Sequence, residues 1–264
     1  MSDDRSRRGA LGVFRRYVCD FVNRHDFSVL PKIMASDYTL FTAGHEIRGR
    51  DGSYRQAVAQ QLEQFPGLVY TLHEIHVTPD AVAVHFTEHG ASNRHQGLPA
   101  SWGSIAIYRA RDGALVNCAI EQDFYSRRRQ LASGEPLAVR SPAIAPWDTL
   151  ESPINAAAEA AVRDWLADAG WESTPGLKLN DGLPTLPDDP RLQQSSIEML
   201  DILSAGDVVA FHALQRGNRA DANPAAGGSA TPYMHIAGLV KVSQGSVRSG
   251  YVIQDRLGLS KRLR

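Results

Sequence analysis

The sequence has little cysteine and no long apolar run, and these shortages exclude two classes of protein. Its only cysteines, Cys19 and Cys118, are too few for a disulfide framework, so we expect a reducing, cytoplasmic environment. No segment reaches the ~18 consecutive apolar residues of a membrane span. The polar stretch at residues 1–12 lacks the apolar core of a secretory signal. We therefore expect no membrane partner.

The sequence also lacks an excess of positive charge. Its 28 Lys and Arg residues are balanced by 29 Asp and Glu residues, so we expect no nucleic-acid partner. The arginine runs at residues 5–8 and 127–129 are short, and we interpret them as solvated ends of the chain or of a helix. No P-loop, GxGxxG after a strand or GxSxG motif occurs, which argues against nucleotide binding and serine hydrolysis.

The first half of the chain shows helical patterns first and strand patterns afterwards. Apolar residues recur at helical spacing over residues 11–25, and residues 27–34 continue as a short helix. Residues 36–47 have the composition of a strand and residues 52–64 that of a third helix. Four strand-like segments follow, at residues 68–77, 81–89, 101–110 and 114–124. This order predicts an α+β fold with helices packed on one face of a curved antiparallel sheet.

A proline-rich stretch then divides the chain, and the pattern begins again after it. Residues 131–153 carry four prolines, and we interpret them as an extended linker that Trp147 docks on a domain surface. The block at residues 109–131 recurs at residues 240–263 with one spacing (Asp255 − Asp123: 255 − 123 = 132). We predict two related domains with a linker between them, at residues 1–132, 133–153 and 154–264.

Further blocks of the second half match the first. His212 matches His85 at a spacing of 127, and Asp181 matches Asp37 at a spacing of 144. Residues 191–203 are predicted to be the third helix of the copy. We expect the second domain to pair with the first as a built-in partner; a homodimer of the whole chain remains open.

The second half keeps few polar candidates for a pocket, and residues 218–231 are predicted to be a mobile loop because they are rich in small residues. The polar candidates are Asp164, His235 and Tyr251. We therefore expect the cavity of the second domain to be degenerate.

Several short motifs of the first half carry a resemblance to a known family. They are Phe65-Pro66-Gly67-Leu68, His89-Gly90 after a strand, Gly97-Leu98-Pro99, Ile107-Tyr108-Arg109 before Asp112-Gly113, and Gln130-Leu131. With these motifs the first half resembles the SnoaL-like polyketide cyclases of the NTF2-like superfamily, to which ketosteroid isomerase and limonene epoxide hydrolase also belong. The resemblance implies two tandem cones, the second diverged, each a bent sheet wrapped by helices around an apolar cavity.

The resemblance also implies a function. Members of these families move protons on a substrate held in the cone and often use no cofactor. We therefore expect a cyclase, lyase, dehydratase or isomerase that acts, without a cofactor, on a small apolar substrate of aromatic or polyketide-like kind in the first domain. A tandem module that binds a ligand or protein without catalysis is the alternative. An epoxide hydrolase of the limonene epoxide hydrolase type is a third reading; it requires an Asp–Arg–Asp or Asp–Glu set around a water molecule, which the sequence alone does not assemble.

Glu121 is the first candidate for the catalytic acid or base. It shares one strand face with Asn117, Ala119 and Asp123, because side chains alternate along a strand. The resemblance places Glu121 closest to the catalytic aspartate of the family, and Asn117, because it shares the strand face, is the candidate substrate-binding group. The alternative is a solvated carboxylate paired with an arginine of residues 127–128.

The repeat separates the two carboxylates of this face. Asp123 is shared with Asp255, whereas Glu121 is replaced by Ile253 in the second half. Asp123 therefore suits a structural cap after the strand better than it suits catalysis. The unshared Glu121 is the better catalytic candidate, with Asp123 kept as a second one.

Two further candidates rest on the comparison with ketosteroid isomerases. The resemblance places Tyr17 where those enzymes carry an oxyanion-hole tyrosine, whose hydroxyl can donate a hydrogen bond to a substrate carbonyl. The region of their general base reads Phe41-Thr42-Ala43 here, and Ala106 and Ile107 replace the second acidic donor. Isomerase chemistry of that kind is therefore disfavoured, and His45 is the candidate substitute base.

His85 lies on a strand whose alternate residues Val82, Val84 and Phe86 are apolar; if these face the core, His85 points away from it. We therefore expect it at an interface between the domains, facing His212, with catalysis as the other reading. The wall of the cavity is assigned to three aromatic residues: Tyr38, Phe41 and Trp102.

The histidines do not predict a metal site. His73 and His76 lie on opposite faces of one strand, and no pair has the helical HExxH spacing. We therefore expect no metal.

Overall fold

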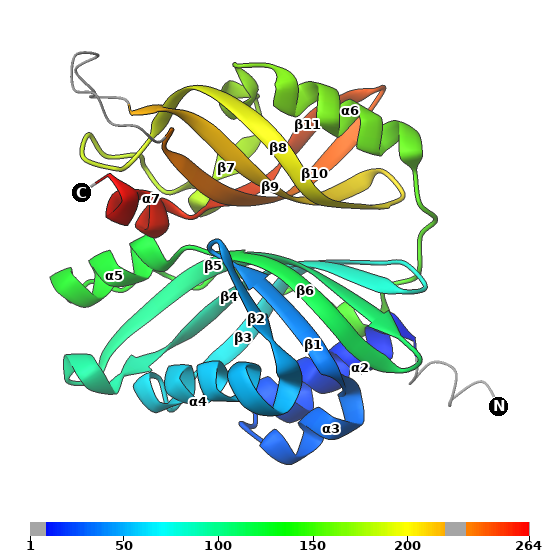
Figure 1. The fold of residues 1–264 in the computed structure, drawn as a ribbon, viewed down its shortest axis with the longest axis vertical. Helices are drawn as coiled ribbons and strands as arrows, with labels where there is room; N and C mark the ends of the chain where they lie inside the picture. The colour runs from blue at the N-terminus through cyan, green and yellow to red at the C-terminus, as the bar shows by residue number, and fades with distance from the viewer. Residues whose placement is uncertain (1–8, 220–230, 264) are drawn as a thin grey trace.

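The computed structural model describes residues 9–219 and 231–263, and these form two units, each a curved sheet with helices on its outer side (Figure 1). The predicted α+β fold is confirmed for both. Most of the predicted loop at residues 218–231 lies outside the described residues. Within the described ranges, no helix is long and apolar enough to cross a membrane.

The first unit places its helices before its meander of strands. Its helical segments are α2 (Ala10–Arg16), η1 (Tyr17–Val22), η2 (Phe27–Val29), α3 (Leu30–Ile33), η3 (Gly49–Tyr54), α4 (Arg55–Gln64), η4 (Asn93–His95) and α5 (Phe124–Ser133). Its strands are β1 (Met34–Thr42), β2 (His45–Arg48), β3 (Val69–Val77), β4 (Ala81–Ser92), β5 (Leu98–Arg111) and β6 (Ala114–Gln122), in the sheet order β2-β1-β6-β5-β4-β3. Strand β1 runs parallel to β6, and the other neighbours are antiparallel.

The strand predicted at residues 36–47 is a hairpin of β1 and β2. Ala43 and Gly44 form its turn, with φ angles of 48° and 80°. Alanine carries no turn preference in sequence, so the composition of the segment concealed the reversal. The turn matters because it brings the backbone N–H of Ala43 to the neighbouring strand β6.

The second unit repeats the meander with fewer helices before it. It comprises η5 (Pro146–Asp148) in the linker, α6 (Ala156–Ala167), η6 (Trp171–Ser173), β7 (Leu177–Leu179), η7 (Asn180–Gly182), β8 (Leu192–Ala205), β9 (Val208–Arg219), β10 (Tyr233–Ser243), β11 (Ser246–Gln254) and α7 (Arg256–Arg262). The sheet order is β7-β11-β10-β9-β8. Helix α6 covers the outer face with Val162 and Leu166, which are buried in the core of the unit.

The helix predicted at residues 191–203 is wrong, because this segment is strand β8. Ile197, Met199 and Ile202 all pack on the second core. A bulge between Met199 and Asp201 shifts the pleat by one residue, so Ile202 returns to the core face. The resulting spacings of two and three residues mimic a helical pattern in the sequence.

The repeat predicted from sequence is visible in the local structure of both halves. The hairpins at Asp112-Gly113 and Gln244-Gly245 both have positive φ at their two central residues. Asp123 accepts a hydrogen bond from the backbone N–H of Ser126 at the start of α5, and Asp255 caps α7 in the same way. The capping role predicted for the shared aspartate is confirmed.

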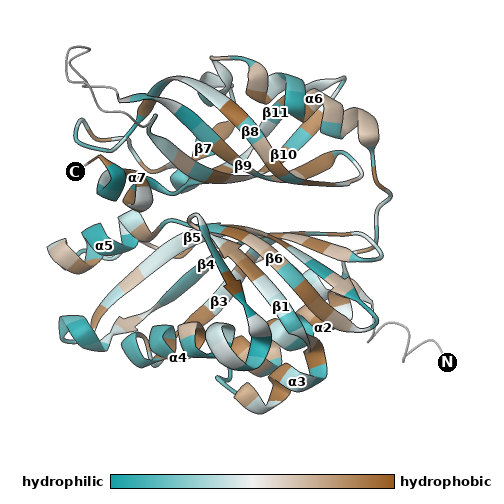
Figure 2. Ribbon diagram, in the orientation of Figure 1, coloured by the Kyte–Doolittle hydropathy of each residue, from teal (hydrophilic) through white to brown (hydrophobic). Residues whose placement is uncertain are grey.

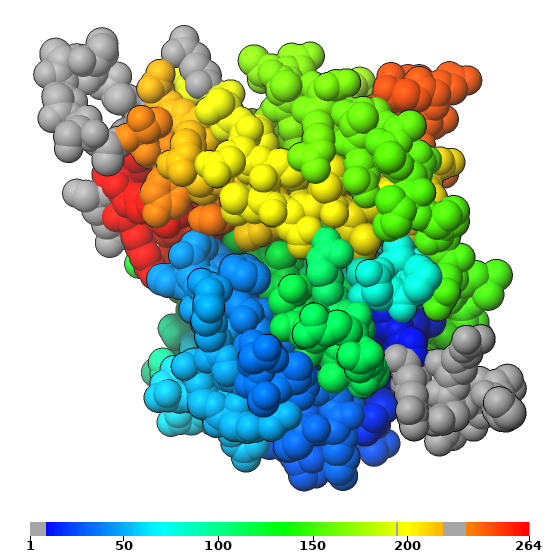
Figure 3. All heavy atoms as spheres, turned by 45° about the vertical axis from the view of Figure 1, so that its right-hand side comes forward, coloured from blue at the N-terminus to red at the C-terminus, as the bar shows by residue number. Residues whose placement is uncertain are grey.

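The two sheets pack against each other through the faces that look away from their helices (Figure 2). Their shared cluster of buried apolar residues consists of Ala81, Ala83, Ile105, Ile107, Leu203, Ala210, Ala237, Leu239 and Ile253. The small alanine side chains allow the sheets to approach closely, and the space-filling view shows the units in contact along their common boundary (Figure 3). The predicted pairing of the two halves within the chain is therefore observed.

The linker is fastened to the first unit. The N–H of Ala143 donates to the carbonyl of Leu72 at 2.7 Å, beside the edge strand β3. The Trp147 ring lies 6.2 Å from that of Phe14, so Trp147 docks on the first unit as predicted.

A buried ion cluster joins the ends of the two units. Arg256, at the start of α7, donates to Asp123 of the first unit at 2.7 Å and to Asp189 at 3.3 Å. Burial raises the pKa of Asp123, and the guanidinium of Arg256 opposes that shift. All three side chains are at most 5% exposed. Asp189 has a second, more exposed partner in Arg129 at 3.4 Å, so Asp123 depends most on Arg256 for compensation.

Replacing Arg256 by Met should destabilise the chain by about 3–5 kcal/mol, because buried Asp123 would lose its cation and buried Asp189 would keep only the more exposed Arg129. Urea unfolding at neutral pH measures the change. The control is Arg262→Met, since Arg262 pairs with Asp255 but is more exposed, at 25%. Equal effects of the two substitutions would contradict the importance given to burial.

Candidate functional site

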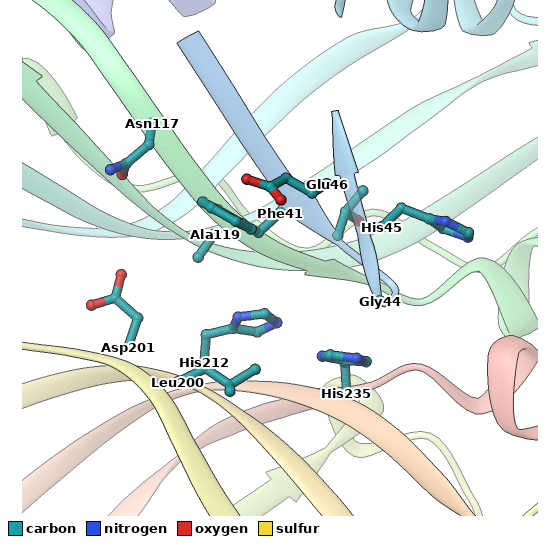
Figure 4. Close-up of a pocket in the computed structure, with 11 residues that line it drawn as sticks. Phe41, Gly44, His45, Glu46, Asn117, Ala119, Leu200, Asp201, His212 and His235 are labelled. Atoms are coloured by element: carbon teal, nitrogen blue, oxygen red, sulfur yellow. The ribbon is translucent and has the colours of Figure 1, made fainter. Parts of the chain in front are cut away.

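A cavity of about 320 Å³ lies between the two units, at the open side of the β1–β2 hairpin (Figure 4). Such a volume suits a small molecule. The first unit contributes Phe41, Thr42, Gly44, His45, Glu46, Asn117 and Ala119 to its lining, and the second contributes Leu200, Asp201, His212 and His235. Both units are therefore needed to form it.

A buried carboxylate–imidazole pair lies at this cavity and links the units. The Nε2 atom of His212 is 2.9 Å from Oε1 of Glu121, and both side chains are at most 5% exposed. The backbone N–H of Ala43 donates to the same carboxylate at 3.1 and 3.3 Å. Burial raises the pKa of Glu121, while the bond to His212 opposes this shift most strongly. The pair is fixed in position because three chain segments hold it.

The structure corrects the expected location of Glu121. The inward-facing residues of β6 are Cys118 and Ile120, which pack in the first core. Glu121 therefore projects from the opposite face of the sheet, toward the second unit, as does Asn117. The alternation argument placed these side chains together correctly, whereas the family resemblance had placed Glu121 at a cavity inside the first domain.

His235 stands beside His212 and was only weakly indicated by the sequence. The two rings are 5.5 Å apart and nearly parallel, and Nδ1 of His235 is buried without a hydrogen-bond partner. Burial lowers the pKa of His235 to about 4, and His212 adds to the shift. His235 is therefore neutral at physiological pH, and its Nδ1 has no hydrogen-bond partner in the protein.

The remaining polar groups of the cavity surround this pair of imidazoles. His45, the candidate base from sequence, is exposed at the tip of the hairpin and lines the cavity mouth. Asp201 projects into the cavity in Figure 4 and pairs with Arg109 at 2.5 Å. Phe41, 37% exposed, lines this cavity between the units, whereas the sequence analysis assigned it to a cavity inside the first domain.

His85 lies at the unit interface, as its strand phase predicted, but its partner was not foreseen. Its Nε2 is 2.7 Å from Oδ1 of Asp181 in the second unit. Arg140 of the linker reaches Nδ1 of His85 at 3.3 Å and the hydroxyl of Tyr251 at 2.7 Å. His85 and His212 therefore each pair with a carboxylate of the opposite unit, which corrects the expectation that they face each other.

The interior of the first unit holds the other predicted residues on the far side of the sheet from Glu121. The hydroxyls of Tyr17 and Tyr54 are 2.8 Å apart and buried, within the first core. Tyr38 and Trp102 are also buried there, and Tyr38 Oη and Trp102 Nε1 have no hydrogen-bond partner. The sheet thus separates Tyr17 from Glu121, so the two do not face one substrate.

Glu88 is a buried carboxylate that the sequence reasoning missed. It accepts hydrogen bonds from Gln61, Ser104 and Gln122 inside the first unit. Burial raises its pKa to about 7, and these bonds oppose the shift. Its place in the alternation after Val82, Val84 and Phe86 marked it as inward-facing, and that signal was available in the sequence.

Comparison with known proteins bears on the first unit. The sequence profile of the SnoaL-like domain matches residues 14–118, which confirms the resemblance stated for this half. Among curated proteins, no match was found.

Solved structures resemble about half of the chain. IdmH from Streptomyces antibioticus is 20% identical over 46% of this chain and 96% of its own, with a TM-score of 0.41. TsrD from Streptomyces laurentii is 22% identical over 46% and 92%, with a TM-score of 0.41. An LEH-like epoxide hydrolase from M. tuberculosis is 16% identical over 50% and 87%, with a TM-score of 0.40. At these identities and scores the likenesses do not bear on function.

The stability contributed by Glu88 should depend on pH. Its folded pKa of about 7 exceeds the unfolded value near 4.5, so the folded state keeps the proton longer. The stabilisation is complete below about pH 4.5 and is lost as pH rises through about 7. As pH rises from about 4.5 to about 7, the free energy of unfolding of Glu88→Gln should therefore increase by roughly 3 kcal/mol relative to that of the wild type. Urea unfolding across this range measures it.

The control for this measurement is Glu63→Gln, because Glu63 is a glutamate of the same unit, on helix α4, and its side chain is exposed. Its stability relative to the wild type should be nearly constant over the same range. A Glu88→Gln difference that is equally flat would show that Glu88 is ionised without cost in the folded state.

Proposed function

From the premise that residues 14–118 form a SnoaL-like domain, we propose that this chain is an enzyme that transfers a proton on a small, largely apolar molecule. The substrate is held in the cavity between the two units and is aromatic or polyketide-like. The reaction is a cyclisation, elimination, dehydration or isomerisation. The observation that carries this proposal is the buried bond between Glu121 and His212 at the cavity.

His212 is the proposed base. A proton-transferring imidazole needs one ring nitrogen held in place and the other directed at the substrate. Glu121 holds Nε2 of His212, so Nδ1 is the nitrogen that accepts a proton from a C–H next to a substrate carbonyl. The carboxylate then stabilises the imidazolium that forms, and the low polarity around the pair strengthens this effect.

The developing enolate requires a hydrogen-bond donor nearby. Asn117 lines the same cavity and its side-chain amide offers N–H groups, so it is the proposed oxyanion donor. Phe41 and Leu200 supply apolar walls for the rest of the substrate. These steps use side chains alone and need no organic cofactor. Asn117 takes the role that the sequence analysis gave to Tyr17, because the sheet separates Tyr17 from Glu121.

A second function is supported by one specific observation. Asp123, Arg256 and Asp189 form an Asp–Arg–Asp set, which is the arrangement that the epoxide hydrolase reading required. However, Asp123 also caps α5, and none of the three residues lines the cavity described above. Proton transfer at His212 therefore has the better geometric support, and a tandem module that only binds its ligand is the remaining alternative.

Replacing His212 by Asn should lower kcat by about 100-fold or more, because general base catalysis contributes about 10²–10⁴-fold. Glu121→Gln should also lower kcat, since the imidazolium would lose its counter-charge. Turnover of a panel of small aromatic ketones and polycarbonyl compounds, followed by absorbance, measures both effects.

The matched control is His85→Asn, because it removes the other histidine–carboxylate bond between the units without touching the cavity. This variant should keep its turnover. Full turnover in folded His212→Asn would refute the mechanism. Binding of panel compounds without any turnover in the wild type would favour the ligand-binding alternative.

A further inference from the structure

Three potential metal ligands converge between the units. A carboxylate oxygen of Glu121 and ring nitrogens of His212 and His235 all lie within 4.8 Å of one another. Glu121 comes from β6, His212 from β9 and His235 from β10, so no single sequence segment shows the spacing of a metal motif. This explains why the sequence predicted no metal.

The donor set has the chemistry that transition metal ions prefer. Two imidazoles and one carboxylate form the protein ligands of several catalytic zinc sites and of the non-haem iron facial triad. Metal–ligand bonds of about 2.0–2.2 Å require the donors to approach by roughly 1 Å, which side-chain rotation can supply. The adjoining cavity leaves room for a water molecule or a substrate at the open coordination position.

The individual ligands are prepared for binding. Glu121 is anchored by the N–H of Ala43, so its carboxylate has little freedom to lose. In Figure 4 the rings of His212 and His235 lie beside each other, and Nδ1 of His235 has no other partner. A buried nitrogen without a hydrogen bond is costly, and coordination would remove that cost.

The charges around the cluster act in both directions. Arg216 and Arg262 lower the pKa of His235 and would therefore also oppose a bound cation. Asp201 and Glu46 also line the cavity, but each is already paired with an arginine, Asp201 with Arg109 and Glu46 with Arg48. The carboxylate of Glu121 is therefore the main negative charge available to a divalent ion.

The repeated architecture provides an internal comparison. His85 and His212 occupy equivalent positions, and the β5–β10 spacing of 132 places Gly103 at the position of His235 (235 − 103 = 132). A Cβ atom at Gly103 would lie 1.8 Å from Oδ2 of Asp181, so no side chain fits there. Among the described residues, no third side chain completes a ligand set with His85 and Asp181. The ring of His73 lies 5.3 Å from that of His85, but both of its nitrogens have hydrogen-bond partners, Ser141 and Thr87.

We propose that Glu121, His212 and His235 form a binding site for a divalent transition metal ion such as Zn²⁺. The site does not rest on the proposed proton transfer. A metal ion on Nε2 of His212 would replace its bond to Glu121, so the metal-loaded and proton-transferring forms exclude each other.

The test measures zinc binding directly. The full-length chain is stripped with a chelator and dialysed against Zn²⁺, and bound metal is determined by elemental analysis. Wild-type protein should bind one Zn²⁺, and Co²⁺ at the same site should give visible absorption. Because loss of even a supporting group costs about 10–100-fold in metal affinity, His235→Ala should weaken binding by about 100-fold or more.

The matched control is His85→Asn, which should bind zinc like the wild type. Glu121→Gln should also lose zinc binding. If Glu121→Gln does not fold, His235→Ala still tests the site, because His235 is only half-buried and its loss should be tolerated. No zinc in the wild type, or equal binding in His235→Ala, would overturn the proposal. Turnover by the chelated chain tests the proton transfer separately, so either idea can fail alone.

Discussion

The contact between the two sheets is the constraint on which the rest of the structure depends. Small side chains such as Ala83 and Ala210 let the sheets approach, and the approach removes water from the polar groups between them. A buried charge without a partner is costly, so each ionisable group at this interface must find its counterpart in the opposite unit. Glu121 with His212, and Asp181 with His85, satisfy that requirement.

The two pairs also show how a duplicated fold acquires an asymmetric site. Ladder pairing places Thr42 beside Ile120 and Leu179 beside Val252, so the turn after β1 corresponds to the turn after β7 at a spacing of 137 (179 − 42 = 137). Asp181 is therefore the counterpart of Gly44 rather than of Asp37, which corrects the sequence alignment. The carboxylate stands on the turn in one half and on strand β6 in the other.

Because the turn of the first unit carries Gly44 instead of an aspartate, space is left beside this turn but not beside the turn that carries Asp181. A Cβ atom at Gly44 would approach Nε2 of His235 to 3.1 Å, so the small residue accommodates the additional imidazole. The cavity, His235 and the buried pair consequently occur together at one end of the interface. The interior of the first unit, by contrast, is packed with aromatic rings around Tyr17 and Tyr54. The chemistry proposed for this chain therefore belongs to the tandem arrangement and not to either unit alone.

Much of the fold was predictable from local patterns. The helix over residues 11–25, the meander of β3 to β6, the Asp-Gly hairpin and the capping Asp123 depend on periodicity and turn chemistry that neighbouring residues set. Strand β8 was not predictable in this way, because its bulge between Met199 and Asp201 imitates helical spacing. The hairpin at Ala43 was also concealed, since only its neighbours impose the turn.

The residues of the candidate site were likewise predictable only where local patterns determine them. The sequence by itself determined that Glu121 shares a strand face with Asn117 and that His85 points away from its core, because strand alternation is a local property. Only the tertiary structure decided that the face of Glu121 is the one that meets the second sheet. It also brought His212 and His235 to Glu121 across 91 and 114 residues (212 − 121 and 235 − 121), since pairing at that separation is set by how the two sheets pack.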